Sequence, residues 1–365
     1  METQSNKIDF SNQNIYVGFD VHLRSWKVTI LTENVAVKTF SQDPNPELLY
    51  QYLKRNFPGG IYHSAYEAGF CGYWIHNKLL SLGINSIVVN PADIPTTNKE
   101  RVQKEDKRDS RKIARSLRSG DLKAIYVPGI KTLEDRGLLR ARGTMVKDLT
   151  RFKNRIKSFL HFHGIEYPES FSKPQSHWSN RFITWLESIE LTEKSGKITL
   201  SSLIQQSKNL RTSVLDLTKQ IQKLSQTELY QNDVKLLRSI PGIGILTAMI
   251  ILTELESILR FGNLDQLCCY IGLVPSTNSS GETEITGDIT PRGHSILRNA
   301  IIESAWVALR HDPVLLKSHL EYCKRMDANK SVIRIAKKLL SRIKFVLKNL
   351  LMQVKAGSKS PDALT

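Results

Sequence analysis

The chain has 365 residues, 40% of them hydrophobic, which suits two or three folded domains and excludes a disordered chain. Its 52 lysine and arginine residues against 35 acidic ones give a formal net charge of +17. This charge is local, because residues 101–160 carry a net +11 and residues 321–355 a net +8. Such segments favour a polyanionic partner such as nucleic acid, although a basic protein without one would have the same composition.

The cysteines and the amino-terminal segment bear on the compartment. Cys71, Cys268, Cys269 and Cys323 form no CxxC pair and no zinc spacing with histidine, which is typical of a reducing environment. The polar start METQSNKIDFSNQN lacks the apolar core of a signal peptide, and no apolar run approaches a membrane span. We therefore expect a soluble cytoplasmic protein with no membrane partner.

The first part of the chain reads as an α/β layer domain over residues 1–130. IYVGFDV, WKVTIL and NVAVKTF are rich in β-branched and aromatic residues and predict three strands. A helix over 46–56, a strand at IYHSAYE, a helix over about 72–82 and a strand at SIVVN follow. Helical spacing from Asp109 to Ser119 precedes AIYVP (124–128), a candidate closing strand. Early strands followed by alternating helix and strand predict helices layered on a sheet.

A basic helical region is expected over residues 131–232. Residues 131–165 have a helical pattern, and the polar segment 166–182, which contains two prolines, predicts a loop. Leu203, Leu210, Leu217 and Leu224 then repeat at seven-residue intervals. Three heptads predict either a coiled coil between chains or a helix that packs within its own chain.

The remaining sequence predicts a mostly helical domain over 233–328, followed by a basic helix and tail over 329–365. Two helices flank the PGIG turn at 241–244, which is either a helix-hairpin-helix-like phosphate site or an ordinary turn between helices. The polar run GLVPSTNSSGETEITGDITPRG is expected to be a loop between two apolar helices. The predicted fold class is therefore α/β plus α.

Four carboxylates are candidates for a metal site. Asp20 lies within a predicted strand and Glu67 ends another, positions where an acid needs a partner. Asp106 and Asp109 share one helix face, although Asp109 alone would simply cap its helix. If the strands of Asp20 and Glu67 are neighbours, the four acids converge, and Mg²⁺ or Mn²⁺ would neutralise them. Two-metal sites of this type polarise a phosphodiester and activate an attacking oxygen.

Serines in the glycine-rich run are candidate nucleophiles. Ser276, Ser279 and Ser280 lie in it, and the guanidinium groups of Arg292 and Arg298 just beyond could hold a phosphate. Serine attack on a phosphodiester would form a covalent intermediate that conserves the bond for rejoining. Ordinary turn serines on a surface loop would have the same composition.

Seven segments of the chain, taken in order, are the basis of a family resemblance: YVGFDVH, AYEAGFCGYW, DKRDSRKIA, LRSIPGIGILTA, RFGNLDQLCCYIGLVPS, SSGE and ITPRGHSILR. In this order the chain resembles the Piv/MooV-type DEDD transposases of the IS110 insertion-sequence family, over roughly 14–130 and 234–325. The resemblance implies a RuvC-like, ribonuclease-H-type amino-terminal domain and a carboxy-terminal transposase domain with a nucleophilic serine. By resemblance the acidic tetrad is Asp20, Glu67, Asp106 and Asp109, and the nucleophile is Ser280, with Ser279 as the second choice.

Two positions depart from the family pattern. Ser110 stands where alanine is common, and Glu282 stands where a small or basic residue is usual, which brings negative charge near the expected phosphate. The resemblance also implies a noncoding bridge RNA as guide, and oligomers in which the RuvC-like domain of one subunit faces the serine domain of another. The basic stretch 131–160 and the heptad helix would then bind RNA and form a dimer or tetramer.

The leading hypothesis is therefore a transposase that exchanges DNA strands with Mg²⁺ or Mn²⁺ and a serine, guided by a bridge RNA. One alternative is a RuvC-type junction nuclease in which water attacks and Ser280 is structural, and another is a site-specific DNA invertase. A third is a catalytically silent nucleic-acid-binding protein. The candidate nucleic-acid-binding residues are Arg151, Lys153, Arg155, Lys157, Arg292 and Arg298.

Overall fold

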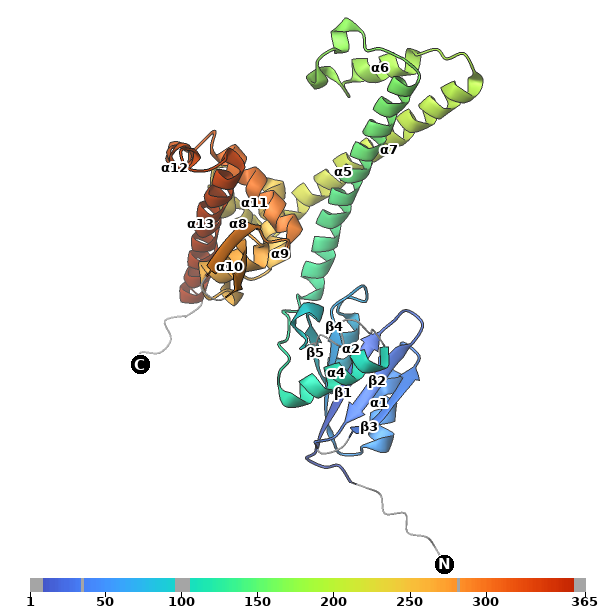
Figure 1. Ribbon diagram of the computed structural model, residues 1–365, viewed down its shortest axis with the longest axis vertical. Coiled ribbons are helices and arrows are strands. Elements are labelled where there is room, and N and C mark those ends of the chain that lie inside the picture. Colours follow the sequence, from blue (N-terminus) through green and yellow to red (C-terminus); the bar gives the residue numbers. More distant parts are fainter. Residues whose placement is uncertain (1–8, 34–35, 96–105, 281–282, 358–365) are drawn as a thin grey trace, which may run out of the picture. The chain divides into compact units, whose positions relative to one another are not determined.

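The computed structural model describes the backbone of residues 9–33, 36–95, 106–280 and 283–357 (Figure 1). Side chains are described for these residues except 36–37, 106–108, 277–280, 283–286 and 350–357. Contacts divide the chain into two compact units, Met1–Val127 and Pro128–Thr365. The first boundary lies close to the predicted one at residue 130, and the finer division into four domains stays a prediction.

A five-stranded sheet in the order β3-β2-β1-β4-β5 organises the first unit. The first three strands form an antiparallel meander, and β4 and β5 run parallel to β1. The predicted strands and helices are confirmed within the described residues, which exclude the first two residues of NVAVKTF. The expected closing strand at 124–128 is reduced to one antiparallel bridge between Val89 and Ala124. The elements are β1 (Asn14–Val21), β2 (Trp26–Leu31), β3 (Ala36–Gln42), α1 (Pro46–Asn56), β4 (Ile61–Glu67), α2 (Trp74–Ser81), β5 (Asn85–Val89) and α4 (Asp106–Ser119).

Burial on both faces explains why the central strand is almost wholly apolar. Ile15, Val17 and Phe19 of β1 have no exposed surface, and the Phe19 ring stacks between Trp26 and Tyr66 at 5.2 Å from each. The opposite face of the sheet is covered by α4, which contacts β1, β2 and β4. The centre of the sheet is therefore covered on both faces, and Asp20 and Glu67 lie at the ends of their strands.

Two long helices begin the second unit and lie side by side (Figure 1). They are α5 (Ile130–Phe162) and α7 (Lys194–Leu224), and the heptad leucines of α7 are partly buried beside α5 of the same chain. The predicted packing within one chain is thus observed, while a coiled coil between chains stays a prediction. We call residues 130–224 the helical arm.

A small hydrophobic core lies at the end of the helical arm where α5 ends and α7 begins. The predicted loop 166–182 instead includes short 3-10 turns and the start of α6 (Asn180–Ser188), so the loop prediction is wrong at its end. Ser179 caps this helix by accepting a hydrogen bond from the Phe182 amide at 3.2 Å. Phe182 and Leu186 of α6 are fully buried against α5 and α7. Phe182 also packs against an aromatic cluster that the polar composition of the predicted loop did not reveal: Tyr167, Phe171 and Trp185.

The rest of the second unit is one helical lobe with a single hydrophobic core. The polar run predicted as a loop forms the antiparallel hairpin β6–β7 instead, because β-branched residues follow its turn. None of the described helices is long and apolar enough to cross a membrane. The elements are α8 (Gln231–Leu237), α9 (Ile245–Leu255), α10 (Leu264–Ile271), β6 (Pro275–Ser280), β7 (Thr283–Ile289), α11 (Ser295–Ala308), α12 (Pro313–Cys323) and α13 (Ala328–Gly357).

The predicted pair of helices around the PGIG turn is confirmed as α8 and α9. Gly242 has φ +89°, and a Cβ there would lie 2.3 Å from the Ser304 carbonyl oxygen of α11. The turn therefore requires glycine both for its backbone conformation and for its contact with α11. The basic helix α13 is part of the same core, since Ile335, Leu339 and Ile343 are fully buried.

Candidate active site

Asp20 and Glu67 occupy neighbouring strands, as the metal hypothesis required. β1 and β4 are parallel, and their register pairs Phe19 with Tyr66, the residues just before these two acids. Side chains two residues apart on a strand share a face. Gly18 and Ala65 both face α4, so Asp20 and Glu67 are placed on that face as well.

The helix α4 approaches β1 very closely at Gly18. A Cβ on Gly18 would lie 2.2 Å from the Ala114 amide nitrogen and 2.4 Å from the Ser110 carbonyl oxygen. The buried Ser110 hydroxyl also shares a hydrogen bond of 2.9 Å with the Thr29 hydroxyl on β2. The serine that departs from the family pattern therefore has a polar partner on the sheet. Asp109 directly precedes Ser110 in α4, and Gly18, the residue that Ser110 approaches, lies two residues before Asp20 in β1.

Among the predicted acids, Asp20 has a histidine as a neighbour. The Asp20 side chain is 21% exposed, and its Oδ2 lies 3.1 Å from Nε2 of His22. Asp106 is the first residue of α4, but its side chain lies outside the described residues. Among the side chains that are described, no group of three or more His, Cys, Asp or Glu residues could hold a metal ion. The predicted donors are all carboxylates, a set whose hard oxygens fit Mg²⁺ or Mn²⁺.

Ser280 ends the strand β6 and pairs across the hairpin with Thr283, and Ser279 pairs with Glu284. The side chains of both serines lie outside the described residues, as does Glu282. At the other end of the hairpin, the Thr290 amide donates a hydrogen bond to the Val274 carbonyl at 2.9 Å. The structure thus shows the backbone on which the candidate nucleophile stands.

The hairpin base, which we define as residues 272–274 and 290–294, is tightly packed. Arg298 donates hydrogen bonds to the Ile271 carbonyl (3.3 Å) and the Arg292 carbonyl (2.8 Å). Gly272 has φ +82°, and a Cβ there would lie 2.4 Å from the Arg292 carbonyl oxygen, so glycine is needed there. Arg298 therefore supports the hairpin base, whereas the exposed Arg292 lies on the surface.

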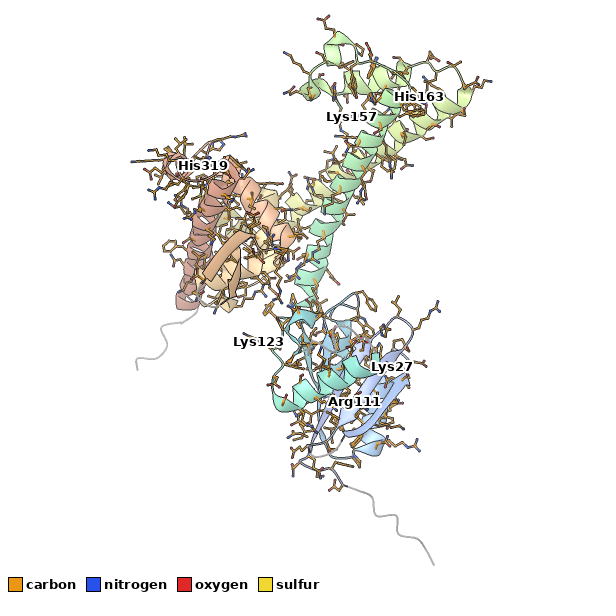
Figure 2. The ribbon with its side chains drawn as sticks, in the orientation of Figure 1. Lys27, Arg111, Lys123, Lys157, His163 and His319 are labelled. Atoms are coloured by element: carbon orange, nitrogen blue, oxygen red, sulfur yellow. The ribbon has the colours of Figure 1, made fainter. Side chains whose placement is uncertain are left out.

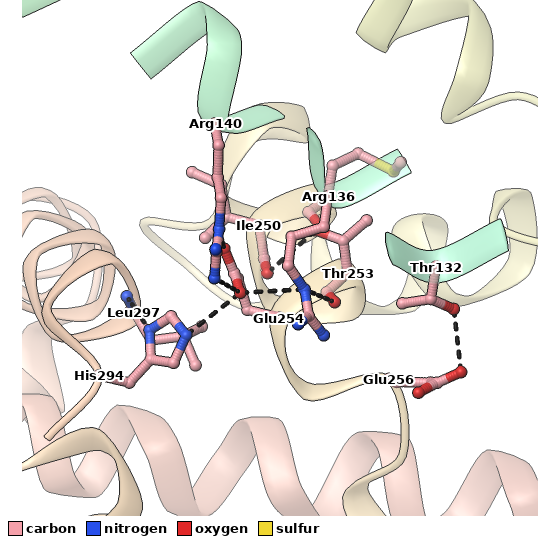
Figure 3. Close-up of polar contacts among 10 residues, drawn as sticks. Thr132, Arg136, Arg140, Ile250, Thr253, Glu254, Glu256, His294 and Leu297 are labelled. Atoms are coloured by element: carbon pink, nitrogen blue, oxygen red, sulfur yellow. Dashed lines mark hydrogen bonds and ion pairs between the residues drawn. The ribbon is translucent and has the colours of Figure 1, made fainter. Parts of the chain in front are cut away.

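A buried carboxylate that the sequence analysis missed lies beside this base (Figure 3). Glu254 of α9 is 2% exposed, and Arg140 binds it with Nε and Nη2, each at 2.8 Å. Arg136 Nε and His294 Nε2 both lie 3.1 Å from its Oε2. Burial alone would raise the pKa of Glu254, but His294 and Arg140 outweigh it and lower the pKa to about 2. The available signal was the pair of acids Glu254 and Glu256 just after the apolar run ILTAMIIL.

The predicted basic residues of the helical arm lie near its far end, where Figure 2 labels Lys157 and His163. Lys153 Nζ lies 5.1 Å from the centre of the Trp178 ring, and burial lowers its pKa, as do Arg211 and Lys157. A groove of about 670 Å³ runs beside these residues. Its lining residues are Arg151, Asn154, Arg155, Ser158, Phe159, Phe162 and Leu203.

Comparison with known proteins places both halves of the chain in transposase families. A family model described as "Transposase", of the DEDD type of IS110, matches residues 17–165. A second, described as "Transposase IS116/IS110/IS902 family", matches residues 234–320. The first match begins within β1 and contains Asp20 and Glu67, and the second contains α9, the hairpin and α11. The two matches define a DEDD-type transposase.

Individual relatives agree with these family models. The y4qE protein of Sinorhizobium fredii is 31% identical over 278 residues, 76% of this chain and 66% of the relative. The transposase of insertion sequence element IS1533 from Leptospira borgpetersenii is 28% identical, over 67% of this chain and 70% of the relative. The transposase of IS1111A from Coxiella burnetii is 25% identical, over 67% of this chain and 64% of the relative. The alignments thus span about two thirds of these relatives. The chain belongs to the IS110 family of transposases.

Proposed function

We propose that this protein cleaves and exchanges DNA strands, with Ser280 as the nucleophile and with Asp20, Glu67, Asp106 and Asp109 as the metal-binding acids. The observation that carries the proposal is the placement of Asp20 and Glu67 on neighbouring parallel strands, on the face that α4 covers. A RuvC-like assignment of this unit is supported by the strand order, in which an antiparallel meander continues into two parallel strands.

The reaction is a transesterification at phosphorus. The Ser280 oxygen forms a bond to the phosphorus while the bond between the phosphorus and the bridging oxygen of the strand breaks. The serine proton is lost to a base, and the released strand oxygen takes up a proton. One phosphoester replaces another, so the bond is conserved for rejoining to a second strand. Mg²⁺ or Mn²⁺ held by the carboxylates would polarise the phosphodiester and stabilise its developing negative charge.

The decisive experiment separates serine attack from water attack. Ser280→Ala should abolish the covalent protein–DNA adduct on denaturing gels while DNA binding is retained. Ser276→Ala is the matched control, because Ser276 lies on the same strand and its hydroxyl donates a hydrogen bond to the Asp288 carbonyl at 3.0 Å. An adduct that persists undiminished in Ser280→Ala refutes the serine mechanism, and free cut ends without any adduct favour the water-using nuclease.

The acids are tested separately from the serine. Asp20→Asn keeps the size of the side chain but removes the charge that a divalent cation requires. We expect this variant to bind DNA and to form no adduct at physiological Mg²⁺. Undiminished strand exchange by Asp20→Asn would exclude the acidic cluster as a metal site.

For partners, we propose DNA as substrate, a noncoding guide RNA on the helical arm, and a homo-oligomer of two or four chains. The arm groove supports an RNA partner because it combines Arg151 and Arg155 with Phe162, which is 85% exposed, and no acid lines it. Cations bind the phosphates and an exposed aromatic ring stacks on unpaired bases. The partly buried heptad face of α7 supports an oligomer, because a second copy could cover its remaining apolar surface.

A further inference from the structure

The Glu254 carboxylate joins two segments that are far apart in the sequence. Arg136 and Arg140 reach it from α5, more than 110 residues earlier in the chain, and His294 reaches it from the segment that follows β7. Arg136 also donates a hydrogen bond to the Thr253 carbonyl at 3.0 Å. We call the first turns of α5, residues 130–140, the root of the helical arm. Glu254 therefore accepts hydrogen bonds from both this root and the hairpin base (Figure 3).

On the hairpin side, both ring nitrogens of His294 are used. Nδ1 accepts a hydrogen bond from the Leu297 amide at 3.3 Å and so caps α11. Nε2 must then carry the hydrogen, which it donates to Glu254 at 3.1 Å. The His294 amide in turn donates to the Tyr270 carbonyl at 3.0 Å. The imidazole thus fixes the point where the chain leaves the hairpin and enters α11.

Because the hairpin base is closely packed, its conformation depends on the position of His294. Gly293 has φ +134°, and a Cβ there would lie 2.6 Å from the Cα of Gly272. The two glycines therefore bring both ends of the hairpin into direct backbone contact. A shift of His294 would move Gly293 against Gly272, and with them the strands that lead to Ser280.

On the arm side, Glu254 and Glu256 act on different parts of α5. Arg140 forms a bidentate pair with Glu254, the arrangement that fixes a guanidinium most strongly in orientation. Glu256 instead holds the start of the helix, because its Oε1 accepts hydrogen bonds from the Gly129 amide at 3.1 Å and the Thr132 hydroxyl at 3.0 Å. Among the described residues, the hydrogen bonds of Glu256 go to Gly129 and Thr132, whereas His294 binds Glu254.

We propose that Glu254 is a positioning residue for strand cleavage: it fixes the hairpin base to the root of the helical arm through His294 and Arg140, so that the two move as one body. The proposal rests on the proposed role of Ser280 and deepens it. Whatever nucleic acid the arm binds is then held in a defined register with the serine hairpin. The carboxylate acts through His294 and contacts no reacting atom.

Three variants test the link. Glu254→Gln keeps the shape of the side chain and removes the charge that Arg140 and His294 bind. His294→Asn keeps a good cap for α11, since asparagine is among the preferred N-cap residues, but is too short to reach Glu254. Glu256→Gln is the matched control, because it alters the other carboxylate that binds α5 and leaves His294 untouched. Thermal unfolding confirms that each variant is folded before the assay.

The rate of adduct formation at saturating DNA is the first measurement. We expect Glu254→Gln and His294→Asn each to slow it by about 10- to 100-fold, the effect of one lost charge-assisted hydrogen bond. DNA affinity should stay unchanged, and the double variant should be no slower than the slower single one. Glu256→Gln should stay within about twofold of the wild type. A wild-type rate in folded His294→Asn, or an equal loss in Glu256→Gln, would overturn the proposal.

Amide hydrogen exchange gives a second measurement that needs no serine chemistry. The Thr290 and His294 amides, which donate to the Val274 and Tyr270 carbonyls, should exchange faster in Glu254→Gln, while the amides of α7 stay as in the wild type. If Ser280→Ala still forms an adduct, the proposed function fails. Hydrogen exchange alone then tests the positioning role of Glu254. Unchanged exchange at both amides overturns the positioning role.

Discussion

Replacing Gly18 by alanine, Gly18→Ala, would put a methyl group into the contact between β1 and α4. The new Cβ would lie 2.2 Å from the Ala114 amide nitrogen and 2.4 Å from the Ser110 carbonyl oxygen. Both obstacles are backbone atoms, so no side-chain rotation can relieve the clash. The helix has to retreat from the strand, and Asp109 moves with it because it precedes Ser110 in α4.

The size of the effect follows from the distances. Carbon contacts below about 3.0 Å do not persist, so α4 must shift by about 1 Å, and overpacking of this kind costs about 1–3 kcal/mol of stability. A shift of about 1 Å in a reacting group costs about 100-fold in rate. We therefore expect Gly18→Ala to weaken the first unit modestly and to reduce metal-dependent cleavage far more strongly.

Two assays check this expectation. Amide exchange of β1 and β4 reports the opening free energy of the first unit, and single-turnover cleavage at saturating Mg²⁺ reports the site. Gly143→Ala is the control, because Gly143 lies inside α5 and a Cβ there has nothing within 4 Å. That change should stabilise the helix by up to about 1 kcal/mol. If Gly18→Ala cleaves at the wild-type rate, the close contact does not position Asp109 and our reasoning is refuted.

Two further predictions concern the second unit. The pKa of Glu254 is lowered from 4.5 to about 2, so its stabilisation is complete above pH 4.5 and is lost as the pH falls toward about 2. This amounts to about 3 kcal/mol, and melting temperatures from about pH 6 to about pH 3 should therefore fall less steeply in Glu254→Gln; identical slopes would contradict the pKa shift. On the helical arm, Arg155→Gln should weaken binding of single-stranded RNA and reduce the salt slope by about 1, as expected for one lost phosphate contact. Lys219→Gln on α7, outside the groove, is the charge-matched control, and an equal loss there would show that only net charge matters.

Local patterns predicted the elements of the first unit closely. The helix at 46–56 and the strand IYHSAYE have the bounds of α1 and β4, because strong local signals surround them. Asn45 caps α1 by accepting a hydrogen bond from the Glu47 amide at 2.8 Å, and Pro46 occupies its first turn. Such caps depend on neighbours in the sequence, so they can be recognised without a fold.

The sequence pattern was insufficient for elements whose conformation depends on residues far away in the chain. The start of α6 lies in the polar, proline-containing segment that was predicted as a loop, and this helix packs on α5 and α7 through the buried Phe182 and Leu186. The hairpin β6–β7 was predicted as a loop because polar residues dominate it, yet its strands satisfy one another's backbone groups. AIYVP had the composition of a strand, but it forms only one bridge with β5.

The candidate site shows the same division. The amino-acid pattern was enough to find the unusual residues: an acid in an apolar strand, acids at a helix start, and basic segments along a helix. Three features were visible only in the folded chain. Asp20 and Glu67 lie on neighbouring strands, α4 packs closely on β1 at Gly18, and Glu254 binds two arginines and a histidine. The physical reason is that residue type and spacing act over a few residues, whereas strand register, close backbone contacts and buried ion pairs join residues that only folding brings together.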